Sequence, residues 1–413
     1  MRNKNCFFQK PLQSREIPSH AKNFTELSLQ RAKLDHVFDE NKEGTYSDLL
    51  CRALWGVSFN QINQSPILGF SLPTPEPVKY VIPRIPYALS NERCLDAPGL
   101  SGNYYSQPVC WATERQIYIG LESTLYSYDV IKRKPQQIED SSIEDSTITA
   151  LAYNSSLSVL ARAGSDHSVQ FIDTIMNTQV RLNQEFSTET TIVSDMNNGF
   201  YMIGQTTGAL VHYDLRGRET TFLVNFPNTM LIGLAFSHHT LAISTNACVQ
   251  LYDSRRMETA RLTFEGHNPP SKALAFSPDT PQRIVTGGGA KDQTLIVWNT
   301  DTGKTIAQKK INNQICGVHW LDHQGVFVAE GYSGNRVSCW SIQGTTLSID
   351  DSSTLHTDKV LFSAQNPRKK EQLATAASGN DEKFHFWSVK NIRKSVKVSD
   401  EIPNSFLNAP IIR

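Results

Sequence analysis

Few residue patterns in this chain could do chemistry, and each of them is incomplete. The stretch "TGKT" (302–305) resembles the end of a phosphate-binding loop, but the glycine required five positions before Gly303 is Trp298. The stretch "GGGA" (287–290) lacks both the Gly-x-Gly-x-x-Gly spacing and a following helix. Both stretches therefore predict loops between strands, and neither indicates a nucleotide site.

Histidine, serine and cysteine give no stronger signal. The 11 histidines include no His-Glu-x-x-His pattern, and no Gly-x-Ser-x-Gly elbow marks a nucleophilic serine. The "SDH" stretch (165–167) is typical of a tight turn. The 7 cysteines are scattered without a Cys-x-x-Cys pair, which favours free thiols in a reducing compartment. We therefore predict no catalytic residue, no metal site and no cofactor, and hence a protein that is not an enzyme.

Charge and hydropathy exclude several classes of partner. Lys plus Arg and Asp plus Glu number 40 each, and a net charge of zero argues against a nucleic-acid surface or a polybasic membrane patch. The longest apolar stretches, such as "LIGLAF" (231–236), are far shorter than the roughly 20 residues of a spanning helix. The first residues lack the apolar core of a signal peptide. We expect a soluble protein of the nucleus and cytoplasm.

An internal repeat indicates which elements position the remaining residues. An aromatic or apolar residue followed by Asp, Asn or Ser recurs at the end of short β-rich runs, at Tyr128-Asp129, Ile172-Asp173, Tyr213-Asp214, Tyr252-Asp253, Trp298-Asn299, Trp340-Ser341 and Trp387-Ser388. The steps between second members are 44, 41, 39, 46, 42 and 47 residues. This is the spacing of WD-type repeats of about 40–45 residues.

Each repeat contains the signals of four strands, as in "SKALAFSPDTPQRIVTGGGAKDQTLIVWNTDTGKTIAQKK" (271–310). A four-stranded sheet cannot bury both faces alone, so such units pack in a ring. We predict an all-β fold, with a seven-bladed WD-type β-propeller over 95–392. The proline-rich residues 1–94 predict a mostly extended N-terminal arm, and 393–413 form a C-terminal tail.

The arm and the tail each carry a candidate docking segment. The stretch "TYSDLLCRALWG" (45–56) predicts a short amphipathic helix whose apolar stripe includes Leu49, Leu50 and Leu54. This stripe packs either on the chain's own propeller or in the groove of a partner. The chain ends in Ile412 and Arg413, which offer an apolar plug, a guanidinium fork and the terminal carboxylate to a receiving pocket.

The combination resembles the Fizzy and Fizzy-related activators of the anaphase-promoting complex. The stretch "CLDAPGLSGNYYSQPVCW" (94–111) is similar to that family's Leu-Asp-Ala-Pro lead into the first blade. The stretches "IVTGGGAKDQTLIVWNTDTG" (284–303) and "QICGVHWLDHQGVFVAEGYSGNRVSCW" (314–340) resemble two of its later blades. The resemblance implies a substrate-recruiting activator of a ubiquitin ligase, in which arm and tail bind ligase subunits and the propeller binds degradation peptides. The resemblance favours a role in the cell cycle. More specifically, it suggests a divergent fungal member of the family that acts in meiosis.

In this family a C-box, Asp-Arg-(Tyr/Phe)-Ile-Pro-x-Arg, precedes the Leu-Leu helix. Residues 14–20 lie in that place, and Arg15, Ile17 and Pro18 match it. His20 replaces the final Arg, and a mostly neutral imidazole cannot form the bidentate fork of a guanidinium. A competing segment, "KYVIPR" (79–84), has the wrong residue before Ile-Pro. The resemblance thus assigns ligase binding to the C-box-like segment, the helix and the Ile-Arg end.

The resemblance also implies two peptide sites on the propeller. The groove for destruction-box (D-box, Arg-x-x-Leu) peptides would include Asn103, which replaces a family acid, and Tyr104. The pocket for Lys-Glu-Asn (KEN-box) peptides would include Gln314 and Lys359, the latter replacing a family Arg. Cys110 stands where the family has Asp, so the acid for the peptide's Lys is expected to be missing.

Two other interpretations remain open at this point. The stretch "DLRGRE" (214–219) faintly resembles the paired-Arg loop of phosphoinositide-binding propellers, although its arginines are not adjacent. A general scaffold propeller would also fit the repeats. It would leave "LDAPGL" (95–100) and the Ile-Arg terminus unexplained.

Overall fold

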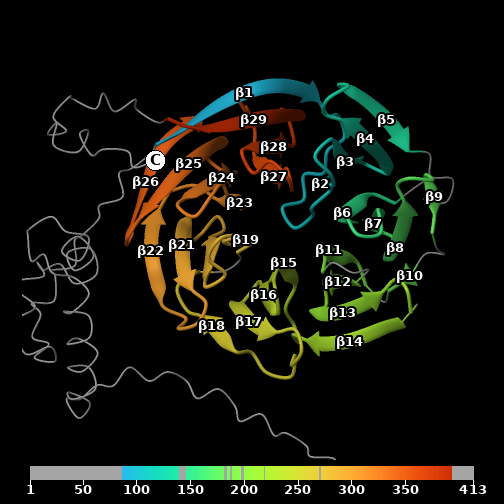
Figure 1. Cartoon of the computed structure of the whole chain (residues 1–413). Helices are drawn as coiled ribbons and strands as arrows, with labels where there is room; N and C mark the ends of the chain where they lie inside the picture. Colours follow the sequence, from blue (N-terminus) through green and yellow to red (C-terminus); the bar gives the residue numbers. More distant parts are fainter. Residues whose placement is uncertain are drawn as a thin grey trace, which may run out of the picture. The chain divides into compact units, whose positions relative to one another are not determined.

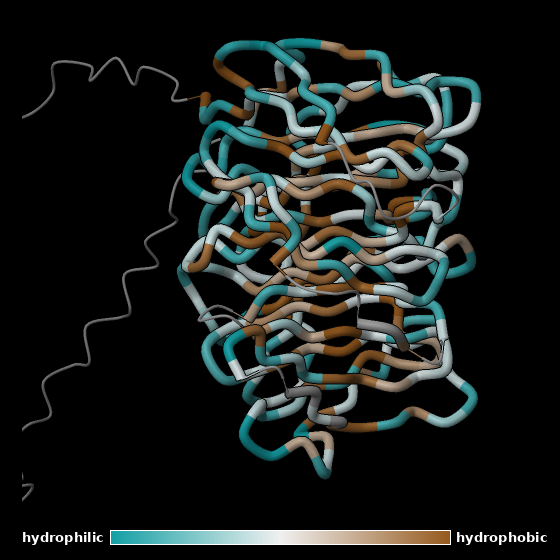
Figure 2. Tube along the Cα trace, turned by 90° about the vertical axis from the view of Figure 1, so that its right-hand side faces the viewer, coloured by the Kyte–Doolittle hydropathy of each residue, from teal (hydrophilic) through white to brown (hydrophobic). Residues whose placement is uncertain are grey.

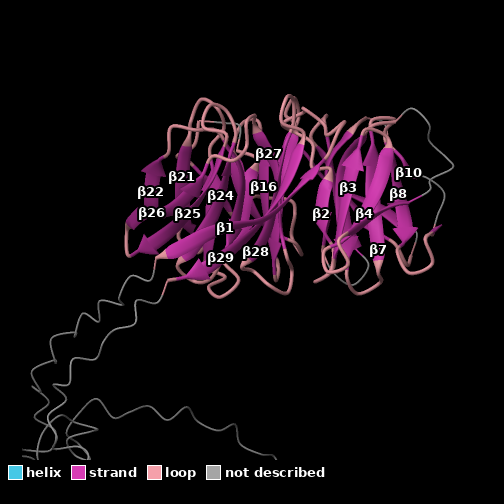
Figure 3. Cartoon of the chain, turned by 90° about the horizontal axis from the view of Figure 1, so that it is seen from above, coloured by secondary structure: helices cyan, strands magenta, loops and turns pink. Residues whose placement is uncertain are grey.

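The computed structural model describes most of the chain after residue 85. The described ranges are 86–138, 146–180, 184–186, 188–196, 200–217, 219–268 and 271–392. Within them the regular elements are strands, β1 to β29, and Figure 3 shows no helix there. The predicted C-box segment, the helix over 45–56 and the Ile-Arg end lie outside the described residues.

The strands form seven antiparallel sheets, which confirms the predicted seven-bladed propeller (Figure 1). Blade 1 consists of β2 (Val109–Trp111), β3 (Gln116–Leu121), β4 (Thr124–Asp129) and β5 (Lys134–Ile138). Blade 2 consists of β6 (Ile148–Asn154), β7 (Val159–Gly164), β8 (Ser168–Asp173), and two short strands that both pair with β8, β9 (Thr178–Gln179) and β10 (Gln184–Glu185). Blade 3 consists of β11 (Thr190–Asp195), β12 (Phe200–Gln205), β13 (Ala209–Asp214) and β14 (Glu219–Asn225).

The remaining blades repeat this order. Blade 4 consists of β15 (Leu231–Ser237), β16 (Thr240–Thr245), β17 (Val249–Asp253) and β18 (Leu262–Phe264). Blade 5 consists of β19 (Ala273–Phe276), β20 (Arg283–Gly287), β21 (Thr294–Asn299) and β22 (Thr305–Lys310). Blade 6 consists of β23 (Ile315–Trp320), β24 (Gly325–Glu330), β25 (Arg336–Gln343) and β26 (Thr346–Ser353). Blade 7 consists of β27 (Val360–Gln365), β28 (Gln372–Ala377), β29 (Lys383–Asn391) and β1 (Tyr87–Asp96).

Blade 7 closes the ring, because its strands come from both ends of the propeller. The outermost strand β1 pairs antiparallel with β29, from Tyr87 opposite Asn391 to Asp96 opposite Lys383. Residues 87–94, which the sequence pattern placed in the arm, therefore belong to a blade. The N–H of Leu89 on the outer edge of β1 donates to the Asp351 carboxylate of blade 6 at 2.8 Å. This side chain protects an edge that would otherwise offer free backbone groups.

In blades 1 to 5 the repeated Asp or Asn caps the turn after the third strand. Asp129 Oδ1 accepts the N–H groups of Ile131 and Lys132 at 2.9 and 2.8 Å. Asn299 Oδ1 accepts the N–H groups of Asp301 and Thr302 in the same way, both at 2.9 Å. Short side-chain oxygens favour such turns. The "TGKT" stretch thus lies in the turn between β21 and β22, as its sequence predicts.

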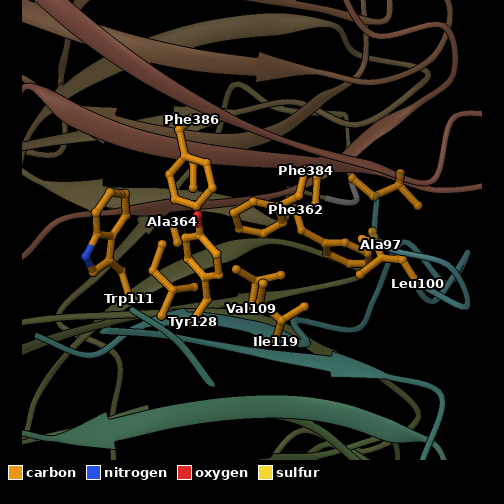
Figure 4. Packing of buried hydrophobic residues seen from close by; sticks show 14 of the residues in the cluster. Ala97, Leu100, Val109, Trp111, Ile119, Tyr128, Phe362, Ala364, Phe384 and Phe386 are labelled. Atoms are coloured by element: carbon orange, nitrogen blue, oxygen red, sulfur yellow. The ribbon is translucent and has the colours of Figure 1, made fainter. Parts of the chain in front are cut away.

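The apolar residues of each blade pack against those of its neighbours, and Figure 2 shows the hydrophobic segments along the strands with hydrophilic turns at their ends. Figure 4 shows the contact between blades 7 and 1, where Phe362, Phe384 and Phe386 meet Val109 and Tyr128. These side chains are almost fully buried. Burying one large apolar side chain stabilises a fold by about 1.5–3 kcal/mol, so this junction fixes the closing blade to the first.

Candidate functional site

The innermost strands all begin at one face of the ring, which we call the start face. Hydrogen bonds join the starts of neighbouring inner strands: Thr149 Oγ1 donates to Thr190 O at 2.8 Å, and Thr191 Oγ1 donates to Leu231 O at 2.6 Å. The loop between β1 and β2, which contains Asn103 and Tyr104, leads to this face. Because every blade contributes one inner strand, residues far apart in sequence meet here.

Lys272, which precedes β19 in blade 5, links three blades at the start face. Its ammonium Nζ donates to Ser106 O in the β1–β2 loop at 2.8 Å and to Leu361 O in β27 at 3.2 Å. It also lies 5.5 Å from the ring centroid of Tyr104 and 4.8 Å from that of Phe362. Burial lowers the pKa of Lys272 to about 8. Carbonyl oxygens and aromatic faces are the groups that compensate this buried cation.

The Tyr104 side chain lies between Lys272 and blade 6. Burial raises the pKa of its phenol, and Cys316 and Gln314 are among the groups that influence it. The hydroxyl oxygen is buried and makes no hydrogen bond within the described part of the chain, although Gln314 is close. A buried polar atom without a partner is costly, so the site favours a ligand or a water molecule that would satisfy this hydroxyl.

Gln314 and Lys359 flank the same cluster. Burial raises the pKa of the Cys316 thiol to about 12, and the nearby cations of Lys272 and Lys359 act in the opposite direction. Two hydrogen bonds fix the backbone of Gln314: its N–H donates to Tyr332 O at 2.7 Å, and its carbonyl accepts the N–H of Gly331 at 2.8 Å. The structure therefore brings three predicted site residues, Tyr104, Gln314 and Lys359, around Cys316.

Lys359 is exposed and its ammonium forms no ion pair with any described residue. Its backbone N–H donates to Asp358 Oδ1 at 2.7 Å, which fixes the start of β27. The cation thus remains available to an acidic group of a bound molecule. Gln314, half-buried beside it, adds an amide that can donate and accept.

Asn103 is exposed, and its side chain supports its own loop. Its Oδ1 accepts the N–H of Tyr105 at 3.0 Å, while its backbone carbonyl accepts the N–H and the hydroxyl of Ser106 at 3.2 and 2.8 Å. An aspartate could make the same contacts and would add a charge. A carboxylate that the sequence analysis missed, Glu382, accepts the N–H of Gly99 in this loop at 3.2 Å.

The structure does not bring Cys110 to this cluster. Cys110 lies in β2, largely buried beside Tyr118 and other apolar residues, and burial raises the pKa of its thiol to about 12. The backbone of Tyr153 and the carboxylate of Asp195 also influence it. The apolar residues around Cys110 belong to blades 1 and 2, whereas Gln314 and Lys359 precede the inner strands of blades 6 and 7. The predicted place of Cys110 beside Gln314 and Lys359 is therefore corrected.

Lys272, Cys316 and Phe362 were not singled out by sequence reasoning. In "SKALAF" (271–276) the lysine looks like an ordinary polar residue just before a strand. Its contacts with other blades exist only because the ring closes, so the local sequence does not indicate them. Within the described ranges no group of three His, Cys, Asp or Glu side chains is placed to hold a metal ion. The same ranges contain no helix long and apolar enough to span a membrane.

Arg216, in the stretch compared with a phosphoinositide loop, contacts its own blade. Its guanidinium lies 4.9 Å from the centroid of the Phe200 ring and 3.7 Å from the carboxylate of Asp214. Both contacts lie within blade 3, and the Arg216 side chain remains exposed.

Comparisons with known proteins agree with this architecture. The WD domain, G-beta repeat family model matches residues 259–299. An Arabidopsis thaliana protein named "Cell division cycle 20.5, cofactor of APC complex" is 25% identical over 328 residues, which cover 77% of this chain and 72% of that protein. The Dictyostelium discoideum "Anaphase-promoting complex subunit cdc20" is 26% identical over 345 residues, 80% of this chain and 68% of that protein.

A Fizzy-related protein and a solved complex are also similar. Protein FIZZY-RELATED 2 of Arabidopsis thaliana is 26% identical over 359 residues, which cover 86% of this chain and 71% of that protein. A chain in the crystal structure of the mitotic checkpoint complex aligns with a TM-score of 0.68 and 26% identity, over 73% of this chain and 96% of that chain. These similarities confirm the resemblance that the sequence indicates.

Proposed function

The chain is a divergent relative of the Cdc20 and Fizzy-related WD-repeat proteins, and from this premise we propose that it is a substrate-recruiting activator of the anaphase-promoting complex. In this role it makes and breaks no bond; it brings a substrate's degradation peptide to the ligase. The observation that carries the proposal is the cluster of Tyr104, Gln314 and Lys359 around Cys316 on a propeller similar to those proteins.

The start face offers suitable chemistry for short peptides. Lys359 supplies a cation without an ion pair among the described residues, Gln314 an amide for a polar side chain, and Tyr104 a buried hydroxyl that none of those residues satisfies. A charge-assisted hydrogen bond contributes about 1.5–3 kcal/mol, enough to set a preference for peptides that carry an acid. A Lys-Glu-Asn peptide fits this description in its Glu and Asn. We assign Arg-x-x-Leu peptides to the neighbouring loop with Asn103.

Attachment to the ligase is assigned to segments outside the described residues. We propose that Arg15, Ile17 and Pro18 bind one ligase subunit, the Leu-Leu stripe of 45–56 a second surface, and Ile412 and Arg413 another pocket. Weak sites on one chain reinforce one another through effective concentration. We also propose that the protein acts in the nucleus and cytoplasm during cell-cycle or meiotic progression.

Co-purification tests this function directly. The full-length chain should capture ligase subunits from a lysate, while deletion of Ile412-Arg413 or the double change Arg15→Ala with Ile17→Ala should weaken that capture. The phosphoinositide alternative is tested by flotation with vesicles that contain phosphoinositides. Capture of no ligase subunit by the wild type, with clear flotation, would replace the proposal by the alternative.

A further inference from the structure

Lys272 is the buried lysine of the described chain, with 9% of its surface exposed. Removing an ammonium group from water is costly unless its charge is compensated. No described carboxylate lies within ion-pair distance of it, and it contacts the carbonyls of Ser106 and Leu361 and the rings of Tyr104 and Phe362. A fold that only needed to fill this space could use an apolar side chain of similar volume.

Each hydrogen bond of Lys272 reaches a segment that carries a proposed peptide-binding residue. Ser106 closes the turn that begins at Asn103, because both its N–H and its hydroxyl donate to the Asn103 carbonyl. Leu361 lies two residues after Lys359 on the same chain segment. One ammonium therefore joins the loop of the Arg-x-x-Leu site to the strand that presents the cation of the Lys-Glu-Asn site.

We infer that Lys272 is a positioning residue that couples the two peptide sites, so that occupation of one fixes the backbone of the other. This inference rests on the proposed function. A peptide that orders the Asn103–Ser106 loop holds the Ser106 carbonyl against the ammonium, and the same ammonium holds Leu361 and so the start of β27. Coupling of this kind is reciprocal, so each peptide raises the affinity of the other by the same factor.

The change Lys272→Met tests the inference, because it keeps a long apolar stem and removes the three donors. With a Lys-Glu-Asn peptide and an Arg-x-x-Leu peptide as probes, calorimetry on the full chain should show that saturation with one raises wild-type affinity for the other about threefold or more. In the variant, the ratio of the affinity for one peptide with and without the other should fall to one. Lys291→Met, at an exposed lysine in the β20–β21 loop, is the matched control and should keep the wild-type ratio.

The pH dependence of the coupling gives a readout that a merely structural role would not change, and it needs no variant. Cys316 and Tyr104 face the ammonium, and Glu330 and Lys359 are further neighbours of Cys316. Burial raises the pKa of both the Cys316 thiol and the Tyr104 phenol, so neither should titrate near neutrality. The coupling ratio should therefore fall as pH rises from 7 through about 8 and above, as Lys272 loses its proton. A ratio constant from pH 7 to 9 would overturn the inference.

Amide hydrogen exchange separates this inference from the proposed function. Lys272→Met should speed exchange at both 101–106 and 360–363, whether or not a peptide is present, and leave blade 3 unchanged. Unchanged exchange in either segment would overturn the inference even if both peptides bind. Failure of both peptides to bind wild-type protein would instead refute the proposed peptide sites.

Discussion

The phenol of Tyr87 donates a hydrogen bond of 2.7 Å to the carboxylate of Asp322, which joins the closing strand β1 to the β23–β24 turn of blade 6. The same Asp322 Oδ1 accepts the N–H groups of Gln324 and Gly325 at 2.7 and 2.8 Å. Gly325 has no Cβ, and a Cβ there would collide with the Tyr87 ring. The strand that closes blade 7 is thus fastened to blade 6 by a polar bond and a close contact.

Removal of this hydroxyl should weaken closure of the ring. Tyr87→Phe keeps the packed ring but leaves the half-buried Asp322 carboxylate without its side-chain donor, so we expect a loss of about 1–2 kcal/mol in the free energy of unfolding. Urea unfolding measures it. The control is Tyr126→Phe, which makes the same substitution at a half-exposed tyrosine of blade 1 and should change the free energy of unfolding by no more than about 0.5 kcal/mol. Equal effects of the two changes would contradict a special role for the Tyr87 bond.

Much of this architecture follows from local sequence. The repeat spacing predicts seven blades, and in blades 1 to 5 the repeated Asp or Asn caps the turn through hydrogen bonds to residues two or three positions later. Such contacts depend on a few neighbouring residues, so the local sequence predicts them directly. The residues 284–303, with their strand and turn signals, likewise give β20, β21 and the turn after them.

Pairings between distant segments could not be predicted in the same way. The pairing of Leu89 with Val389 spans the whole propeller, and nothing in "YALSNERCLD" (87–96) marks it as the outer strand of the last blade. Lys272 and Cys110 show the same limit for side chains. Their neighbours are set by ring closure and by how far along an inner strand each lies, and a local pattern records neither.

Acid should destabilise the protein through a half-buried histidine. Burial lowers the pKa of His319 from 6.5 to about 4, although its contact with Ser363 acts in the opposite direction; Nε2 lies 2.9 Å from Ser363 Oγ. Because the folded pKa is below the unfolded value, the stability due to the neutral ring is complete above pH 6.5 and is lost as pH falls toward 4.

The measurement compares wild type with His319→Gln, which retains a polar group but cannot titrate. The wild-type free energy of unfolding should fall relative to the variant by up to about 3 kcal/mol between pH 6.5 and 4. Above pH 7 the difference between the two proteins should be constant. Parallel curves across the acidic range would show that His319 is as easily protonated in the folded protein as in the unfolded one.

A single charge should strengthen the Arg-x-x-Leu site. Asn103→Asp preserves the acceptor for the Tyr105 N–H and adds a negative charge on an exposed side chain. A peptide arginine should gain a charge-assisted bond, which at an exposed site we expect to raise affinity by about three- to tenfold. Fluorescence anisotropy with the peptide and with its Arg→Ala form measures this. Equal affinity of the wild type and the variant would place Asn103 outside the site.

Because Cys110 packs between blades 1 and 2, an acidic residue at this position should destabilise the fold and should not strengthen peptide binding. The side chain is largely buried among the apolar residues between blades 1 and 2 and has no described cation beside it. An aspartate at this position would bury an uncompensated carboxylate, so Cys110→Asp should lower the free energy of unfolding by about 3 kcal/mol or more. It should not raise the affinity for a Lys-Glu-Asn peptide, because Cys110 packs between blades 1 and 2 and not beside Gln314 and Lys359. Cys94→Asp, at an exposed cysteine of β1, is the matched control and should cost less than about 1 kcal/mol. A stable Cys110→Asp protein that binds the peptide more tightly would return Cys110 to the start-face site.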